Sequence, residues 1–113
     1  GGIGRMRQTC GAACGLFMLA GLETGATQAE DRAGKSANYA LVQQLAAQFE
    51  EINGSPICGE LLGLKAQPHN DPQAAERTEA YYKKRPCVKM VESAAQLWAN
   101  HILHQEQTDK TVE

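Results

Sequence analysis

The chain has 113 residues, enough for one domain with a single hydrophobic core, and we treat residues 1–113 as one domain. Apolar residues make up 42% of the chain and charged residues 21%, which argues against global disorder. The formal net charge is −2, with acidic and basic residues interleaved, which argues against a nucleic-acid-binding surface. The longest apolar stretch, residues 11–22, is shorter than the roughly 20 residues that a membrane-spanning helix needs. No other targeting segment is recognisable, so we expect no membrane association and a cytoplasmic location.

The first nine residues form a glycine-rich, basic lead-in, and the first predicted helix spans residues 9–25. Thr9 can cap the start of this helix, and Gly25 suits its end. Apolar residues are distributed nearly all round the helix: Leu16, Phe17, Met18, Leu19 and Leu22. This pattern predicts a central, buried helix rather than a surface helix.

Residues 28–52 form the second predicted helix. Apolar residues recur along it at steps of three and four and give one stripe: Tyr39, Val42, Leu45, Ala46, Phe49 and Ile52. Asn53 and Gly54 are typical of a helix end. Ser55 suits an N-cap and Pro56 suits a first helical position, so the pair predicts a short third helix over residues 57–64.

A polar loop with Pro68, His69 and Pro72 precedes the fourth predicted helix, residues 73–84, which Asp71 can cap. Pro86 ends this helix and opens the last one. The apolar stripe of the last helix comprises Val88, Val91, Ala94 or Ala95, Trp98 and Ile102. The polar tail, residues 107–113, is expected to fray. The sequence therefore predicts an all-α fold, an irregular bundle of about five helices.

Three of the four cysteines fall at predicted helix N-termini: Cys10, Cys58 and Cys87. Unpaired backbone N–H groups and the helix dipole favour negative charge at such positions, and the thiolate is the reactive and metal-binding form of cysteine. Basic residues precede two of these cysteines, at positions 5 and 7 and at positions 83–85. The local context therefore favours thiolates. The glycines at positions 1, 2 and 4 are expected to let the backbone pass close to these thiols.

Cys14 lies one helical turn after Cys10, on the same face of the first predicted helix. This spacing suits two ligands of one metal better than a disulfide, which requires Cβ atoms about 3.8 Å apart. No usual zinc-binding spacing is present, however. Each cysteine can also be a plain buried residue, because free cysteines are often part of the core. Of the four, Cys14 fits that interpretation best.

The segment Cys10-Gly11-Ala12-Ala13-Cys14-Gly15 matches the motif CGAxxG, and it follows a glycine-rich lead-in. With Cys58 and Cys87 downstream, the chain resembles the C_GCAxxG_C_C family of small helical proteins, from Gly1 to about Leu97. The resemblance implies that Cys10, Cys58 and Cys87 match three family cysteines. The family's first cysteine, on an additional N-terminal helix, has no counterpart in residues 1–113, and Cys14 occupies a variable position of the motif. For function, the resemblance implies redox activity by dithiol exchange or through an iron–sulfur cluster.

Two functional hypotheses follow. In the first, Cys10, Cys58 and Cys87 are redox thiols and Cys14 is accessory, in a thiol-based or metal–thiolate oxidoreductase or an electron-transfer protein with a redox partner protein. A metal version would hold an iron–sulfur cluster or zinc on the same four cysteines. In the second hypothesis, the protein is a helical interaction module with buried structural cysteines. A homodimer is expected under either hypothesis, because a missing N-terminal helix would leave apolar surface exposed.

Overall fold

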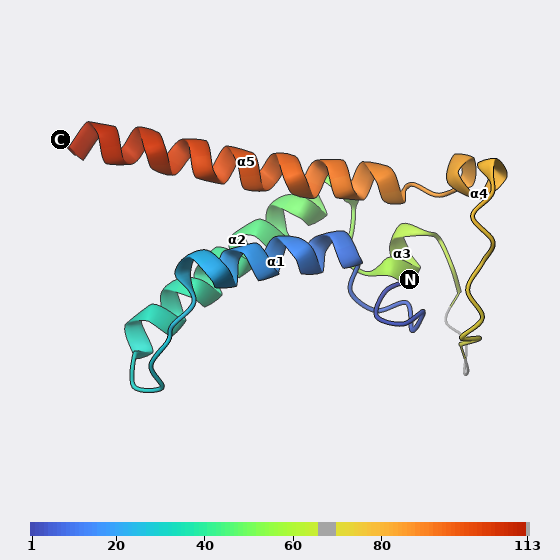
Figure 1. Cartoon of the computed structure of the whole chain (residues 1–113), viewed down its shortest axis with the longest axis horizontal. Helices are drawn as coiled ribbons and strands as arrows, with labels where there is room; N and C mark the ends of the chain where they lie inside the picture. Colours follow the sequence, from blue (N-terminus) through green and yellow to red (C-terminus); the bar gives the residue numbers. More distant parts are fainter. Residues whose placement is uncertain (66–69, 113) are drawn as a thin grey trace.

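The computed structural model describes residues 1–65 and 70–112, with side chains as far as residue 106. Five helices are present: α1 (Gly11–Thr24), α2 (Arg32–Asn53), α3 (Cys58–Leu61), α4 (Glu79–Lys84) and α5 (Cys87–Val112) (Figure 1). The described part of the chain contains no β-strand beyond a single isolated bridge. The predicted all-α bundle of about five helices is therefore confirmed. Within the same residues, no helix is long and apolar enough to cross a membrane.

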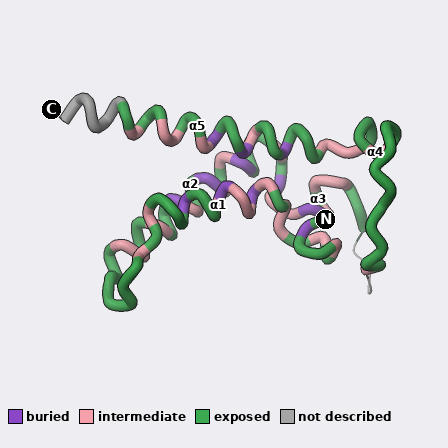
Figure 2. Tube along the Cα trace, in the orientation of Figure 1, coloured by how far each residue is buried: buried purple, intermediate pink, exposed green. Residues whose placement is uncertain are grey.

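The core lies where α1, α2 and α5 pack together. The largest fully buried side chains are Leu16 of α1 and Leu45 and Phe49 of α2. From α5, Met90, Ala94 and Leu97 complete this core. Figure 2 shows the buried residues concentrated between these three helices, whereas both ends of the molecule are largely exposed. The remaining helices, α3 and α4, lie beyond one end of the core (Figure 1).

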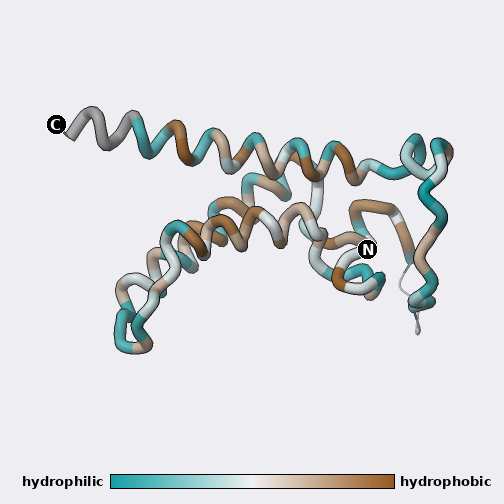
Figure 3. Tube along the Cα trace, in the orientation of Figure 1, coloured by the Kyte–Doolittle hydropathy of each residue, from teal (hydrophilic) through white to brown (hydrophobic). Residues whose placement is uncertain are grey.

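Helix α1 is not buried on all sides, so this part of the sequence prediction was wrong. Ala13, Leu16 and Ala20 face the core, whereas Met18 is 70% exposed and Leu22 is 85% exposed. The reason is that α2 and α5 cover only one side of the helix. Because α1 is apolar along most of its length (Figure 3), its sequence does not indicate which side stays uncovered.

Helix α2 begins at Arg32, later than the predicted residue 28, because the Asp31 carboxylate accepts a hydrogen bond from the Gly34 N–H and caps the helix. It ends as predicted, with Gly54 in the left-handed region at φ 97°. The predicted stripe is correct at Leu45 and Phe49, which are buried. It is wrong at both of its ends, Tyr39 and Ile52, which are exposed.

Helix α5 begins directly after Pro86, as predicted, and the Pro86 carbonyl accepts a hydrogen bond from the Met90 N–H. Its buried stripe comprises Met90, Ala94 and Leu97. Val88 and Val91, predicted to be in the core, are 64% and 59% exposed. The prediction is correct at Ala94, and Trp98 is half-buried against the core, but the buried face of the helix is rotated toward Met90 and Leu97 and away from Val88 and Val91. The helix extends to Val112, beyond the predicted start of the polar tail.

The two short helices are shorter than predicted. Helix α3 covers only Cys58–Leu61 of the predicted residues 57–64, and α4 covers only Glu79–Lys84 of the predicted residues 73–84. Thr78 caps α4 by accepting from the Tyr81 N–H, whereas Asp71 accepts from the Gln73 N–H in a local turn that starts no helix. Residues 71–80 are all exposed, so no packing stabilises a longer helix there. The predicted polar loop at Pro68 and His69 lies outside the described residues.

Candidate thiol site

Cys10 and Cys58 are positioned by backbone pairing between the segment before α1 and the segment before α3. Thr9 and Ile57 form an isolated antiparallel bridge. On either side of it, the Cys10 N–H donates to the Pro56 carbonyl and the Cys58 N–H donates to the Gln8 carbonyl, both at 2.7 Å. Diagonal neighbours across such a bridge lie on the same face, typically about 7–8 Å apart. The bridge therefore brings these two cysteines together although they are far apart in the sequence.

The same pairing explains why two predicted caps were wrong. Thr9 is part of the bridge, and the N-cap of α1 is Cys10, which makes no side-chain capping hydrogen bond. Ser55 accepts a hydrogen bond from the Ile57 N–H, but α3 begins only after Ile57. Pairing with the lead-in keeps the backbone before α3 extended, so the helix starts late.

The glycine-rich lead-in closes over Cys58. The backbone of Gly2 is in the left-handed region at φ 61°, and a Cβ atom built at this position would overlap the Cβ of Cys58. The Gly2 carbonyl accepts a hydrogen bond from the Gln8 N–H at 2.9 Å, which holds the lead-in as a closed loop. The predicted close passage of the glycine backbone beside a cysteine is therefore confirmed.

Cys87 reaches the same region from the start of α5. It lines one cavity of about 160 Å3 together with Cys10 and Cys58, and we call this space the thiol cavity. Its other lining residues are Gly1, Gly2, Gly11, Ala12, Leu61, Leu62, Pro86, Met90 and Val91. Three cysteines from three separate segments thus border one small space. Cys14, half-buried one turn further along α1, does not line it.

The three thiols of the cavity differ in their access to solvent. Cys87 is exposed, Cys10 is half-buried, and Cys58 is buried at 6% exposure. All four cysteines of the chain are free thiols in this structure. Over residues 1–65 and 70–106, no three His, Cys, Asp or Glu side chains are arranged to hold a metal ion.

A positive charge lies beside the buried thiol. The Arg7 Nη1 atom is 4.0 Å from the Cys58 Sγ atom, at the long limit of a hydrogen bond to sulfur. Arg7 precedes Cys10 by three positions in the sequence, but the folding of the lead-in over α3 places it beside Cys58. The predicted helix N-terminus at Cys58 is that of α3, which is one turn long and has little dipole. The charged group beside Cys58 is therefore the Arg7 guanidinium rather than the end of a long helix.

A family model matches most of this chain. The sequence model of the C_GCAxxG_C_C family, described as "Putative redox-active protein (C_GCAxxG_C_C)", matches residues 1–101. This range contains the lead-in, all five helix starts and all four cysteines. No curated protein and no solved structure gives a significant match.

Proposed function

The chain belongs to the C_GCAxxG_C_C family, and from this premise we propose that it is a redox protein acting by thiol–disulfide exchange at Cys10, Cys58 and Cys87. The observation that carries the proposal is that these three cysteines, from three separate segments, all line the thiol cavity. All three are free thiols, as the reduced form of such a protein requires.

We assign the first attack to Cys87. It is exposed and is the first residue of the 26-residue helix α5. Its thiolate displaces one sulfur of a partner disulfide, which leaves as a thiolate, and a mixed disulfide forms. A thiolate can attack a partner disulfide only when its sulfur is accessible to the partner, as that of Cys87 is.

We assign the second attack to Cys58. It is buried beside Arg7, so it is shielded from large partners and suited to react inside the protein. Its thiolate attacks the Cys87 sulfur, releases the second partner thiolate and leaves a Cys58–Cys87 disulfide. Two electrons pass from the protein to the partner, and an external thiol or dithiol must reduce the protein again. Cys10 borders the same cavity and can replace Cys58 in this step.

Zinc or an iron–sulfur cluster on the four cysteines is the competing version of this proposal. The described residues do not present three ligands arranged for a metal, and Cys14 lies outside the cavity. These observations favour thiol exchange. Metal analysis of anaerobically purified protein tests the choice. Iron or zinc bound at one equivalent or more, and lost in the variant Cys87→Ser, would overturn the thiol-exchange mechanism.

The kinetic test uses the reduced protein and a chromogenic disulfide, with both released thiolates counted. The variant Cys87→Ser is expected to lose the fast phase, with a rate constant lower by about 100-fold, because the accessible thiolate is gone. The double variant Cys10→Ser/Cys58→Ser is expected to release only one thiolate per protein and to stop at the mixed disulfide. Cys14→Ser is the matched control, and its rate should stay within about twofold of the wild-type protein. A fast phase that survives without Cys87, or that disappears without Cys14, would contradict the proposal.

A second candidate function is a helical interaction module that forms a homodimer. It is favoured by the apolar side chains that α1 and α5 leave uncovered: Met18, Leu22, Val88 and Val91. Sedimentation velocity of the wild-type protein and of Leu22→Lys tests it. A dimer that the substitution dissociates would support the module, whereas a monomer at all concentrations would reject it.

A further inference from the structure

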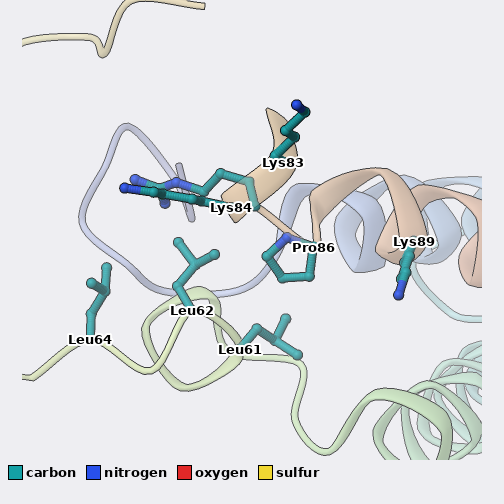
Figure 4. A pocket seen from close by; sticks show the side chains of 8 residues that line it. Leu61, Leu62, Leu64, Lys83, Lys84, Pro86 and Lys89 are labelled. Carbon is teal, nitrogen blue, oxygen red and sulfur yellow. The ribbon is translucent and has the colours of Figure 1, made fainter. Parts of the chain in front are cut away.

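A second cavity, of about 550 Å3, adjoins the thiol cavity. Three leucines, from α3 and the residues after it, line one side, and a cationic segment around the end of α4 and the start of α5 lines the other. Its complete lining, which we call the basic pocket, is Leu61, Leu62, Leu64, Lys83, Lys84, Arg85, Pro86 and Lys89. Figure 4 shows the leucine side chains on one side and Lys84 extending above Leu62 on the other, whereas Lys83 points away from the leucines. The volume is within the roughly 300–1,000 Å3 typical of sites for small organic ligands.

The charge of this pocket is of one sign. Four of its eight lining residues are Lys or Arg, and none is Asp or Glu. The whole chain has only 11 Lys and Arg and a net charge of −2, so this is a local concentration of positive charge on a slightly acidic protein. Within residues 1–65 and 70–106, the single ion pair joins His101 to Glu23, and it involves none of these four cations. An anion would therefore meet positive charges that no carboxylate of these residues neutralises.

The basic pocket and the thiol cavity have walls in common. Leu61, Leu62 and Pro86 line both spaces. Pro86 is also the residue before Cys87, the exposed thiol of the cavity. The basic pocket therefore adjoins the cavity that is lined by Cys87, the residue to which we assign the first attack.

We propose that the basic pocket binds the substrate of the exchange reaction, and that this substrate is a low-molecular-weight disulfide that carries carboxylates or other anionic groups. The inference rests on the proposed function, because it names the partner of that reaction. The anionic groups pair with Lys84, Arg85 and Lys89, and the apolar part packs on the leucines. One sulfur of the bound disulfide is then within reach of Cys87. The exchange follows by the attack of Cys87 on this sulfur and the later attack of Cys58 on the mixed disulfide.

The experiment compares two disulfide probes on the full-length protein, dithiobis-nitrobenzoate, which is anionic, and dithiodipyridine, which is neutral. Modification of Cys87 is followed by peptide mass spectrometry in stopped reactions. The variant Lys84→Glu is expected to slow the anionic probe by about tenfold, a typical size for electrostatic steering, and to change the neutral probe by less than twofold. The wild-type preference for the anionic probe should fall as salt is raised, because ions screen the pocket.

The matched control is Arg32→Glu, which changes the net charge of the chain by the same amount at the first residue of α2, remote from α4 (Figure 1). It is expected to leave both probe rates within twofold of the wild-type rates. Equal slowing of the anionic probe by the two variants would contradict binding in the basic pocket, because the change in net charge alone would explain the slower reaction. Equal slowing of both probes by Lys84→Glu would also overturn it, since a structural change would explain that result.

This test reads only the first attack on Cys87, and it separates the pocket from the redox mechanism. If Lys84→Glu discriminates between the probes but no disulfide forms within the protein, the pocket holds and the dithiol mechanism fails. If the disulfide forms but neither probe is preferred, the mechanism holds and the anionic-substrate proposal fails.

Discussion

The two ends of this molecule are held together by different interactions. The helical end, formed by α1, α2 and α5, is held by buried apolar side chains, of which Phe49 and Leu45 are almost completely shielded from solvent. At the cysteine end, formed by the lead-in, α3 and α4, the lead-in and α3 are joined largely by backbone hydrogen bonds around the bridge between Thr9 and Ile57. Among the described residues of this end, only Gly2, Ser55 and Cys58 are buried.

The helical end contains the buried core that stabilises the fold, whereas the cysteine end contains the thiol cavity. Burial of apolar surface is the dominant favourable contribution to folding, so the helical end carries most of the folding free energy. The cysteine end is built from turns and short helices, which open at lower cost than a packed core. Under the proposed exchange mechanism, this arrangement lets the thiols move while the scaffold stays folded.

The largest expected effect is on the helical end. Phe49→Ala removes a side chain with no exposed surface and should lower the free energy of unfolding by about 3–5 kcal/mol, from lost burial and the cavity left behind. Urea denaturation followed by circular dichroism measures it. The control on the same helix is Tyr39→Ala, which is 61% exposed and should cost less than about 1 kcal/mol. Similar losses for both variants would show that α2 does not carry the core.

A smaller and more local effect is expected from Gly2→Ala at the cysteine end. The added Cβ overlaps Cys58, so the lead-in should lift away and expose this thiol. Alkylation of Cys58, followed by peptide mass spectrometry, should become at least tenfold faster, while the unfolding free energy changes by about 1–2 kcal/mol.

Gly4→Ala is the matched control for this prediction. Gly4 has a similar backbone conformation, at φ 58°, but no atom lies within 4 Å of the position its Cβ would occupy. It should therefore show the strain of a left-handed alanine without exposing Cys58. Faster alkylation in both variants would mean that backbone strain, and not contact with Gly2, controls access to the thiol.

The smallest expected effect concerns charge within the cysteine end. Arg7→Met removes the positive charge 4.0 Å from the Cys58 sulfur and should slow resolution of the mixed disulfide by about three- to tenfold, because the thiolate loses a favourable neighbour. Arg7→Lys keeps the charge and should restore most of the rate. Failure of lysine to restore it would indicate that Arg7 acts through packing, and neither variant should change the unfolding free energy by more than about 1 kcal/mol.

The two ends also differ in how well the sequence predicted their structure. At the helical end, periodicity and turn residues correctly predicted the helices and the burial of Leu45 and Phe49, since these depend on local patterns. Periodicity could not decide which face of α1 is covered, nor which apolar residues of α5 face the core. Several faces of these helices are apolar, and packing against the neighbouring helices determines which of them is buried.

At the cysteine end, local patterns were less informative. They indicated Cys10, Cys58 and Cys87 as residues at the starts of helices, and the structure places all three around one cavity. Their redox role stays a prediction. The bridge of Thr9 with Ile57, the approach of Arg7 to Cys58 and the basic pocket all depend on contacts between segments far apart in the sequence. No spacing along the chain reveals such contacts.

Disulfide mapping by mass spectrometry after stepwise oxidation of the full-length protein tests the central claim most directly. The account predicts that the first disulfide joins two of the three cavity cysteines, with Cys58–Cys87 as the main product and Cys14 still a free thiol. A first disulfide that contains Cys14, or four thiols that stay free when an excess of disulfide is supplied, would contradict it.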